Sequence, residues 1–438
     1  MTKRRRFPRI FFGWWTVLAG GFLALVGHGY YVYGFSALFK PIASELGFSR
    51  AVTSVAAGIG RFEGGIEAPA SGWLADKIGP RLVILFGISV IGISLILMYY
   101  INSLWAFYVV WGVMLGTGLN VALAIPLEKA ITNWFVKKRG LAMGVRWSLF
   151  ASLWLLPVIT WLIVTYGWRM TCVTGGVVML VVGLPLTWFF IRDQRPEYYG
   201  LLPDGATSEA ETKEDTGATI GRGAKYAADF QEIEFTLRQA MRTPAYWLLI
   251  VVQVLQLAGR NSLIMHQIPL LTDMGLDPTK AANVTLLAGV GGLATRFAVG
   301  FMADRVKKQH LRFLYAGAIM LQTIGITIFL LNQTLSMVYP LLILHNVGGG
   351  VNVVITTIIV SRYFGRKAFG SIRGTSTAVG MPLGILAPIY MGWIYDTTGS
   401  YITGFTVFAI AGALGAVLIF LALPPKPPTE VTDIRKFL

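Results

Sequence analysis

The sequence predicts an all-α membrane protein with twelve transmembrane helices in two pseudo-symmetric six-helix halves. Three observations favour this fold class. The 438 residues have a mean hydropathy of +0.63, and 13% of them are charged, about half the share found in soluble domains. Apolar runs of roughly 20 residues, the length that spans a hydrocarbon core of ~30 Å, recur along the chain. Short motifs also repeat at matching places in the two halves.

Twelve apolar runs are long enough to cross a membrane. The first follows a basic stretch, as a signal peptide would, but it is too long and lacks a small-residue cleavage site, so we expect it to remain as a helix. The expected spans are 11–38, 50–74, 81–101, 104–127, 140–165, 168–191, 244–271, 280–303, 311–331, 335–360, 369–394 and 401–423.

The stretch between the sixth and seventh spans predicts a linker. Its middle, 206–217, is polar, acidic and poor in large apolar residues, which is typical of a flexible segment. Its end has Thr236 as a helix cap and an apolar side, which predicts a short interfacial helix. The expected parts are a first six-helix half at 1–191, a cytoplasmic linker with that helix at 192–241, a second half at 242–423 and a cytoplasmic tail at 424–438.

The basic residues give the expected orientation. With a cytoplasmic N-terminus, 28 of the 37 Lys and Arg lie in inner segments, four in outer segments and five within spans. The positive-inside rule therefore predicts cytoplasmic N- and C-termini and a multi-pass protein of the inner (plasma) membrane, with the lipid bilayer as its first partner. The net charge of +16 mostly reflects this topology, so we expect no nucleic-acid partner.

Metal, cofactor and enzyme functions are not expected. Cys172 is the single cysteine, and the four histidines form no pair at ligand spacing, so the sequence predicts neither a metal site nor a cofactor. No nucleophile, base and orienting group can be named together, which argues against an enzyme.

Two motifs repeat between the halves. The run 72–79, Gly-Trp-Leu-Ala-Asp-Lys-Ile-Gly, follows the second span, and 300–307, Gly-Phe-Met-Ala-Asp-Arg-Val-Lys, follows the eighth. A pair of arginines seven residues apart begins the fifth span and another begins the eleventh; these are Arg139 with Arg146, and Arg366 with Arg373. Parallel repeats of this kind are a transporter architecture, with the substrate near the midplane between the halves.

The first of these runs resembles the loop motif of the major facilitator superfamily, G-x-L-A-D-R/K-x-G-x-R/K, which 72–81 matches closely. A carboxylate beside a helix end and its flanking cations form ion pairs that hold one gate state and break in the other. The resemblance implies the major facilitator fold. The expected gating residues are Asp76, Arg81, Asp304, Arg146 and Arg373, with substrate binding left open for the last two.

Within that superfamily, the chain resembles the branch of monocarboxylate porters and oxalate:formate exchangers. The resemblance rests on four sequence features: Gly13-Trp14-Trp15, Trp134-Phe135 with 137–144, Pro196-Glu197 with 200–205, and 266–269 with Asp273 and Gly275. In monocarboxylate porters an arginine in the eighth span anchors the substrate carboxylate, and Arg296 occupies the matching place. A guanidinium stays charged and holds a carboxylate through two hydrogen bonds. Such porters can carry an aspartate one turn earlier, where Gly292 stands here.

A second group of polar residues lies along the seventh span. Gln253, Gln256, Arg260 and Gln267 share one helical face, which either lines the substrate cavity or packs against neighbouring helices. His266, near the outer end of this helix, is either a substrate contact or a structural histidine.

Two carboxylates in the second span are candidates for proton coupling. Glu63 and Glu67 are four residues apart and so lie on one helical face, where like charges resist double ionisation. The alternative is a static network with Arg61 or Arg146. Further candidate substrate contacts are His28, Tyr31, Asn120, Asn346 and Asn352.

The sequence thus favours a secondary transporter of a small organic anion, most simply a monocarboxylate, by alternating access. Proton symport is the leading hypothesis and exchange against a counter-anion of the oxalate:formate type is the second. Efflux of a drug or metabolite is a third hypothesis and a non-transporting membrane sensor is a fourth. A sensor would need a soluble output domain, which the linker and tail do not supply.

Overall fold

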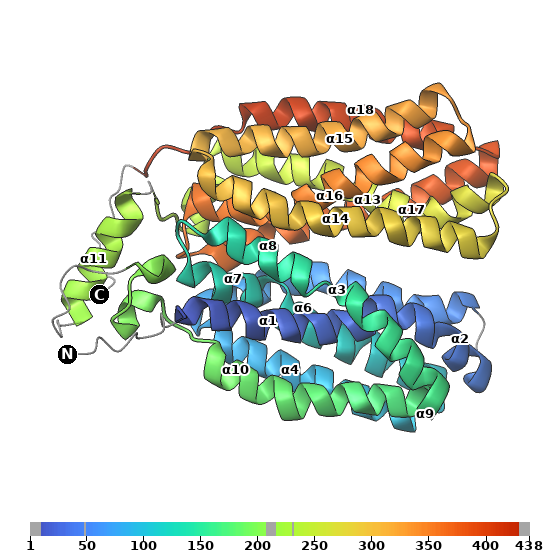
Figure 1. Cartoon of the computed structure of the whole chain (residues 1–438), viewed down its shortest axis with the longest axis horizontal. Coiled ribbons are helices and arrows are strands. Elements are labelled where there is room, and N and C mark those ends of the chain that lie inside the picture. The colour runs from blue at the N-terminus through green and yellow to red at the C-terminus, as the bar shows by residue number, and fades with distance from the viewer. Residues whose placement is uncertain (1–9, 48–49, 207–215, 230–231, 429–438) are drawn as a thin grey trace, which may run out of the picture.

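The chain folds into helices joined by short loops, as the computed structural model shows for residues 10–47, 50–206, 216–229 and 232–428 (Figure 1). None of these residues lies in a β-strand. The all-helical prediction is therefore confirmed over the described ranges.

The first group of helices comes from the N-terminal part of the chain. Short π or 3-10 turns join several of them into longer rods. Its members are α1 (Phe12–His28), α2 (Phe35–Leu46), α3 (Arg50–Lys77), α4 (Pro80–Leu97), α5 (Leu104–Phe107), α6 (Gly116–Leu123), α7 (Ile125–Trp134), α8 (Arg139–Leu149), α9 (Leu156–Val178) and α10 (Leu184–Phe190).

The second group contains longer, uninterrupted helices. Its members are α13 (Pro244–Asp273), α14 (Pro278–Arg305), α15 (Leu311–Leu331), α16 (Leu335–Phe364), α17 (Phe369–Thr398) and α18 (Ile402–Leu421). Two helices lie between the groups in sequence, α11 (Thr216–Asp229) and α12 (Leu237–Met241).

Twelve segments cross the apolar region. Nine helical stretches of the described chain are long and apolar enough to span a membrane. One of them, Leu156–Phe190, turns at Gly167, where φ is 79°, and so supplies parts of the fifth and sixth spans. The rod of α1 and α2 and the charged helix α3 supply the first two spans. The predicted twelve-helix architecture is therefore confirmed.

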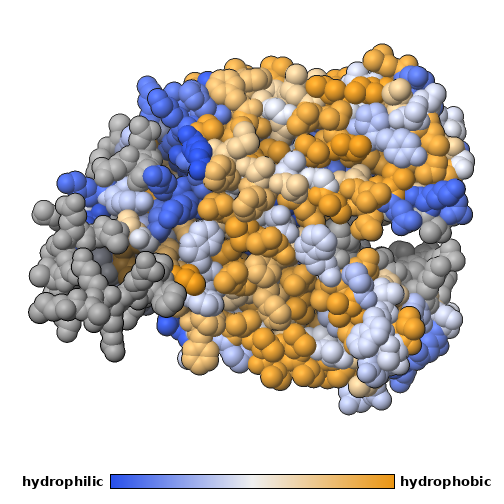
Figure 2. Space-filling model, in the orientation of Figure 1, coloured by the Kyte–Doolittle hydropathy of each residue, from blue (hydrophilic) through white to orange (hydrophobic). Residues whose placement is uncertain are grey.

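The two groups lie side by side and meet most closely at one end (Figure 1). We call this the linker end, because α11 lies there, and we call the other the opposite end. α8 packs against α14 and α3 packs against α17. Hydrophobic residues cover the side of the bundle, and hydrophilic residues gather at its two ends, as a membrane protein requires (Figure 2).

The linker is partly helical. Thr236 caps α12 and forms a capping box with Gln239, which confirms the predicted cap. α11 was not expected from the polar composition of its region. Most of the predicted flexible segment, 207–215, lies outside the described residues.

Candidate functional site

The groups meet at the linker end through two aspartates that bind helix N-termini of the opposite group. Asp304, at the end of α14, accepts hydrogen bonds from the backbone N–H groups of Gly140 (2.6 Å) and Leu141 (2.7 Å), where α8 begins. The first N–H groups of a helix have no partner within it and carry partial positive charge, so a carboxylate stabilises them. Asp304 therefore holds α8 against α14.

Asp76 makes the matching contact in the other direction. Placed at the end of α3, it accepts hydrogen bonds from the backbone N–H groups of Gly370 (3.1 Å) and Ser371 (2.6 Å), where α17 begins. The hydroxyl of Ser371 also donates to it (2.6 Å), and Lys129 forms an ion pair with it. The predicted gating residues Asp76 and Asp304 thus both lie at the interface.

Glycines bring the helices close enough for these bonds. A Cβ on Gly72 would lie 2.1 Å from the carbonyl oxygen of Gly370, and one on Gly140 would lie 2.3 Å from that of Gly300. Real Cβ atoms do not approach so closely, so any larger residue would separate the backbones. The repeated Gly-x-x-x-Asp pattern therefore supplies both the close contact and the acceptor.

Two arginines bind helix C-termini of the opposite group. Arg139, where α8 begins, donates from Nη1 to the carbonyl oxygen of Ser361 near the end of α16 (3.0 Å). Arg366, which follows α16, donates from Nη1 to the carbonyl oxygen of Asn133 near the end of α7 (2.7 Å). A cation at a helix C-terminus interacts favourably with the helix dipole. The repeat thus extends from sequence to contact geometry.

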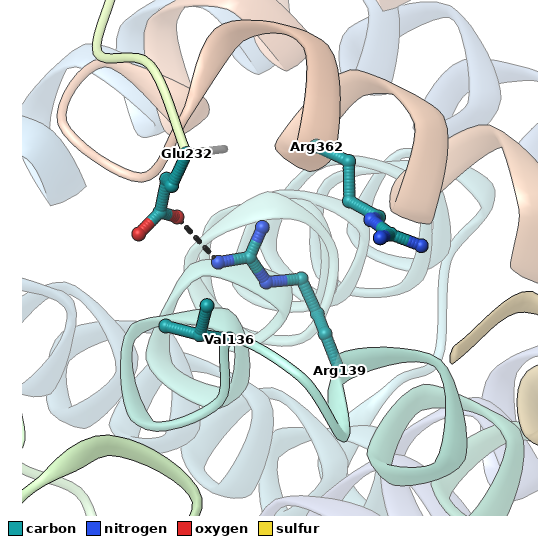
Figure 3. A pocket seen from close by; sticks show the side chains of 4 residues that line it. All are labelled: Val136, Arg139, Glu232 and Arg362. Carbon is teal, nitrogen blue, oxygen red and sulfur yellow. Dashed lines mark hydrogen bonds and ion pairs between the residues drawn. The ribbon is translucent and has the colours of Figure 1, made fainter. Parts of the chain in front are cut away.

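Glu232, from the linker, joins these two arginines, and Figure 3 shows its contact with Arg139. Its carboxylate lies 2.6 Å from Arg139 Nη2 and 3.1 Å from Arg366 Nε, and all three side chains are buried. Burial would raise the pKa of Glu232, but the guanidinium groups of Arg366 and Arg139 outweigh it and lower the pKa from 4.5 to about 2. Glu232 therefore stays ionised at neutral pH.

Further from the linker end, an ion pair crosses the interface within the apolar region. Arg373 of α17 lies with Nε 3.5 Å from Oε2 of Glu128 in α7. Its Nη1 also donates to Oε1 of Gln253 in α13 (3.2 Å). Arg146 is buried and donates from Nη2 to the carbonyl oxygen of Leu123, where α6 ends (2.8 Å). In the described contacts, Arg373 thus binds a residue of the opposite group, whereas Arg146 binds a residue of its own group.

Arg296 lies deeper in the bundle, eight residues before Asp304 on α14. Its Nη1 donates to the carbonyl oxygen of Trp147 in α8 (3.2 Å), and Ser148 donates to the carbonyl oxygen of Leu293 (2.9 Å). The Arg296 side chain is partly exposed. The bond to the Trp147 carbonyl oxygen orients the guanidinium. A cation is thus held between the two groups.

The two candidate proton carriers face α6 of their own group. Glu67 accepts hydrogen bonds from Thr117 Oγ1 (2.6 Å) and Asn120 Nδ2 (3.2 Å). Asn120 also donates to the carbonyl oxygen of Gly60 (3.1 Å), and Glu63 is half-buried. Glu67 and Asn120, which the sequence assigned to different roles, therefore form one network.

The polar face of α13 turns toward helices of its own group. Gln256 accepts a hydrogen bond from Nδ2 of Asn352 in α16 (3.1 Å), while Gln253 accepts from Arg373. Arg260 lines a small cavity in the second group, among α13, α15, α16 and α18. The described contacts match the packing alternative, and the substrate-binding roles of Gln253, Gln256, Arg260 and Asn352 stay predictions.

The remaining candidate residues contact their own helix group, and His28 is half-buried in α1. Their roles likewise stay predictions. The contacts are His266 Nε2 with the Pro388 carbonyl oxygen (3.0 Å), Asn346 Nδ2 with the Leu342 carbonyl oxygen (2.9 Å), the Tyr31 ring stacked on Trp111, and the Arg81 guanidinium over Trp188 (3.8 Å).

Sequence reasoning missed several charged residues at the interface, among them Glu128, Lys129 and Glu232. The fourth apolar run ends at 127, so Glu128 and Lys129 read as loop residues, but α7 continues to Trp134 with every residue buried. The apolar residues Ile131 and Trp134, one turn apart, are a helical signal that extends past the charges. Glu232 has no comparable signal in its polar surroundings.

Removing the Asp304 carboxylate should loosen the linker end. Asp304→Asn replaces two charge-assisted bonds by weaker ones, at a cost of about 1–3 kcal/mol. In a Cys172→Ser background, maleimide should then label Asn133→Cys, a buried position at this end, roughly ten-fold faster or more. The control is Asp396→Asn, an exposed aspartate at the opposite end of α17. Equal labelling rates in both backgrounds would refute the role of Asp304.

Glu232 should contribute stability that disappears in acid. Because its pKa falls from 4.5 to about 2 on folding, the contribution is complete above pH ~4.5 and is lost as pH falls toward 2. Glu232→Gln should lower the free energy of unfolding by about 3 kcal/mol at neutral pH, measured by thermal and denaturant unfolding in detergent. The difference from wild type should shrink below pH ~4.5.

The control for this change is Glu45→Gln, which breaks a more exposed ion pair with Arg169 at the opposite end. Such a pair contributes at most about 1 kcal/mol. The stabilising role of Glu232 would be contradicted if Glu232→Gln lowered the free energy of unfolding no more than the control does. It would also be contradicted if the difference from wild type did not depend on pH.

Comparison with known proteins places this geometry in a family. Residues 20–386 match the description "Major Facilitator Superfamily". Monocarboxylate transporter 13 of Rattus norvegicus is 23% identical, with 96% of this chain and 91% of that protein covered. The gallate transporter of Pseudomonas putida is 26% identical, with 66% of each covered.

Solved structures agree on the fold. The proton:xylose symporter XylE superposes with a TM-score of 0.69, at 12% identity, over 94% of this chain and 95% of that chain. The family match covers most of the chain, and the paired aspartates and glycines occupy equivalent places in the two groups. The chain belongs to the major facilitator superfamily of membrane transporters.

Proposed function

We propose that the protein is a secondary active transporter of a small organic anion, in the first place a monocarboxylate, and that Arg296 binds the substrate carboxylate. The position of Arg296 carries this proposal. Arg296 is partly exposed, and its Nη1 donates to the Trp147 carbonyl oxygen where α14 of one group contacts α8 of the other. A guanidinium stays charged and holds a carboxylate through two hydrogen bonds, so this position between the two groups suits a carboxylate substrate.

The relatives support the same substrate class. They include proteins named for monocarboxylate and gallate transport, at identities of 23% and 26%. These identities are low, and the proposal for this chain therefore rests on Arg296 and is tested there.

The contacts at the linker end fit one state of an alternating-access cycle. The positive-inside pattern favours a cytoplasmic location for this end and for the termini. The contacts of Asp76, Asp304, Arg139 and Arg366 then close the cytoplasmic side, while substrate reaches Arg296 from the opposite end. Transport requires these contacts to break and the opposite end to close.

We also propose proton symport as the coupling mode, with Glu63 and Glu67 as the proton carriers. Glu67 accepts two hydrogen bonds from side chains of α6. Glu63 lies one turn away on the same face, where a second negative charge is unfavourable. This arrangement supports Glu63 as the residue that gains and loses the proton. Exchange against a counter-anion is the alternative.

Arg296→Gln should abolish substrate uptake without unfolding the protein. Purified protein in liposomes is supplied with labelled lactate, pyruvate, aromatic acids, formate and oxalate, and uptake of the transported acid should fall at least ~100-fold, as loss of a charge-assisted anchor worth about 3 kcal/mol implies. Arg312→Gln is the matched control, because Arg312 is likewise partly exposed and donates to a backbone carbonyl of α18 within its own helix group. Undiminished uptake by Arg296→Gln would exclude the anchor.

Glu63→Gln should uncouple uptake from the proton gradient. Wild-type liposomes are expected to concentrate substrate only when the side from which it enters is more acidic, whereas the variant, which cannot gain or lose a proton there, should only equilibrate it. Counterflow with substrate inside checks that the variant still carries the anion. Uptake that ignores pH but requires an internal anion would replace symport by exchange.

A further inference from the structure

A small cavity lined by Arg260 lies within the second helix group, apart from Arg296. It has a volume of about 10 Å³, room for about one water-sized particle. No residue of the first group lines it. The lining residues are Leu255, Gln256, Gly259, Arg260, Gln322, Thr323, Ile326, His345, Phe408 and Gly412.

The polar atoms that line this cavity are mostly hydrogen-bond donors. Gln322 and His345 are each 4% exposed, and Gln322 Nε2 and both ring nitrogens of His345 have no hydrogen-bond partner. Arg260 adds a guanidinium beside His345. A neutral imidazole has one donor and one acceptor nitrogen, so two donors lack a partner here, the Gln322 amide and one N–H of His345. A buried donor without a partner costs about 1–3 kcal/mol, so two at one cavity are unusual. They point to a bound acceptor.

The lining offers little negative charge to meet these donors. It contains no Asp or Glu. The Gln256 carbonyl oxygen is already used by Asn352, and the Thr323 hydroxyl donates to the carbonyl oxygen of Ile319 (3.0 Å). The lining therefore combines a guanidinium with hydrogen-bond donors and contains no carboxylate.

A glycine of the run 348–350 makes room for one donor. A Cβ on Gly348 would lie 2.7 Å from Cγ and 3.3 Å from Nε2 of Gln322. It would also lie 2.5 Å from the carbonyl oxygen of Ala318, so α15 and α16 approach closely here. Close helix packing and the position of the Gln322 amide thus depend on the same glycine.

We infer that this cavity binds a monatomic monovalent anion such as chloride. The Gln322 amide, an N–H of the His345 imidazole and the Arg260 guanidinium supply the donors. A carboxylate has three heavy atoms and needs more space than the cavity has, so the anion is not the transported substrate. The bound anion joins α13, α15 and α16 through these donors.

The inference is tested by the stability of wild-type protein in matched salts. Thermal unfolding in detergent is followed while sodium chloride or sodium bromide replaces sodium gluconate at constant ionic strength. A saturable rise in melting temperature of a few °C is expected with either halide, because a ligand that binds only the folded state stabilises it. Equal melting temperatures in all three salts would show that the cavity holds water only and would overturn the inference.

The variant Gln322→Glu tests whether the halide binds in this cavity. The new carboxylate replaces a donor by an acceptor and pairs with Arg260, so the halide response should vanish while the melting temperature in gluconate stays at or above the wild-type value. Gln267→Glu, a second glutamine in a membrane helix that does not line the cavity, should keep the response. A full halide response in Gln322→Glu would place the anion elsewhere and overturn the assignment.

Crystals of the wild-type protein grown in sodium bromide test the site directly, without any substitution that could alter folding. The anomalous signal of bromide should lie within hydrogen-bonding reach of Gln322 Nε2 and His345. A bromide peak elsewhere, with none in the cavity, would overturn the inference. These readouts do not use transport, so failure of the anion site and failure of the Arg296 proposal are distinguishable.

Discussion

The closed linker end depends on charged side chains that bind the ends of helices in the opposite group. Aspartates bind the N-termini of α8 and α17, and arginines bind the C-termini of α7 and α16. A helix end carries only partial charge, and it has unsatisfied backbone groups wherever it stops. The interface therefore uses groups that every membrane helix must expose, so it needs few specialised residues. The glycines of the repeat add the close approach that these short bonds require.

The fold and this interface were largely predictable from the sequence, because each rests on a local pattern. Apolar length identifies the crossings, and the runs after the second and eighth spans identify Asp76 and Asp304. The central residues were harder to place. Gln256 and Arg260 share the polar face of α13, but that face meets helices of its own group, which depends on how the helices rotate when packed. The periodicity of polar residues in a single helix does not reveal how that helix is rotated against its neighbours.

Contacts made by isolated residues were not predictable. Glu128 and Lys129 lie beyond the apolar run that defines the fourth span, and only the continuation of α7 buries them. Glu232 lies in a polar linker, and nothing in its local sequence distinguishes it from the other acidic residues of that linker. In each case the partner is distant in sequence and in the other helix group, so the residue gains its importance from tertiary structure alone.

Glu232 also differs from the aspartates and arginines of the interface because it is not one of a repeated pair. The aspartates and arginines occur as related pairs, whereas one linker carboxylate is shared by both Arg139 and Arg366. Arg366 also pairs with Glu197 of the linker, at 3.2 Å, whereas the described carboxylate partner of Arg139 is Glu232. If the groups separate at this end and the Glu232 carboxylate leaves Arg139, that buried cation then needs solvent. Separation of the groups, displacement of the linker and entry of water are thus coupled steps. In the proposed alternating-access cycle, the connection between the two halves of the repeat therefore moves together with this end.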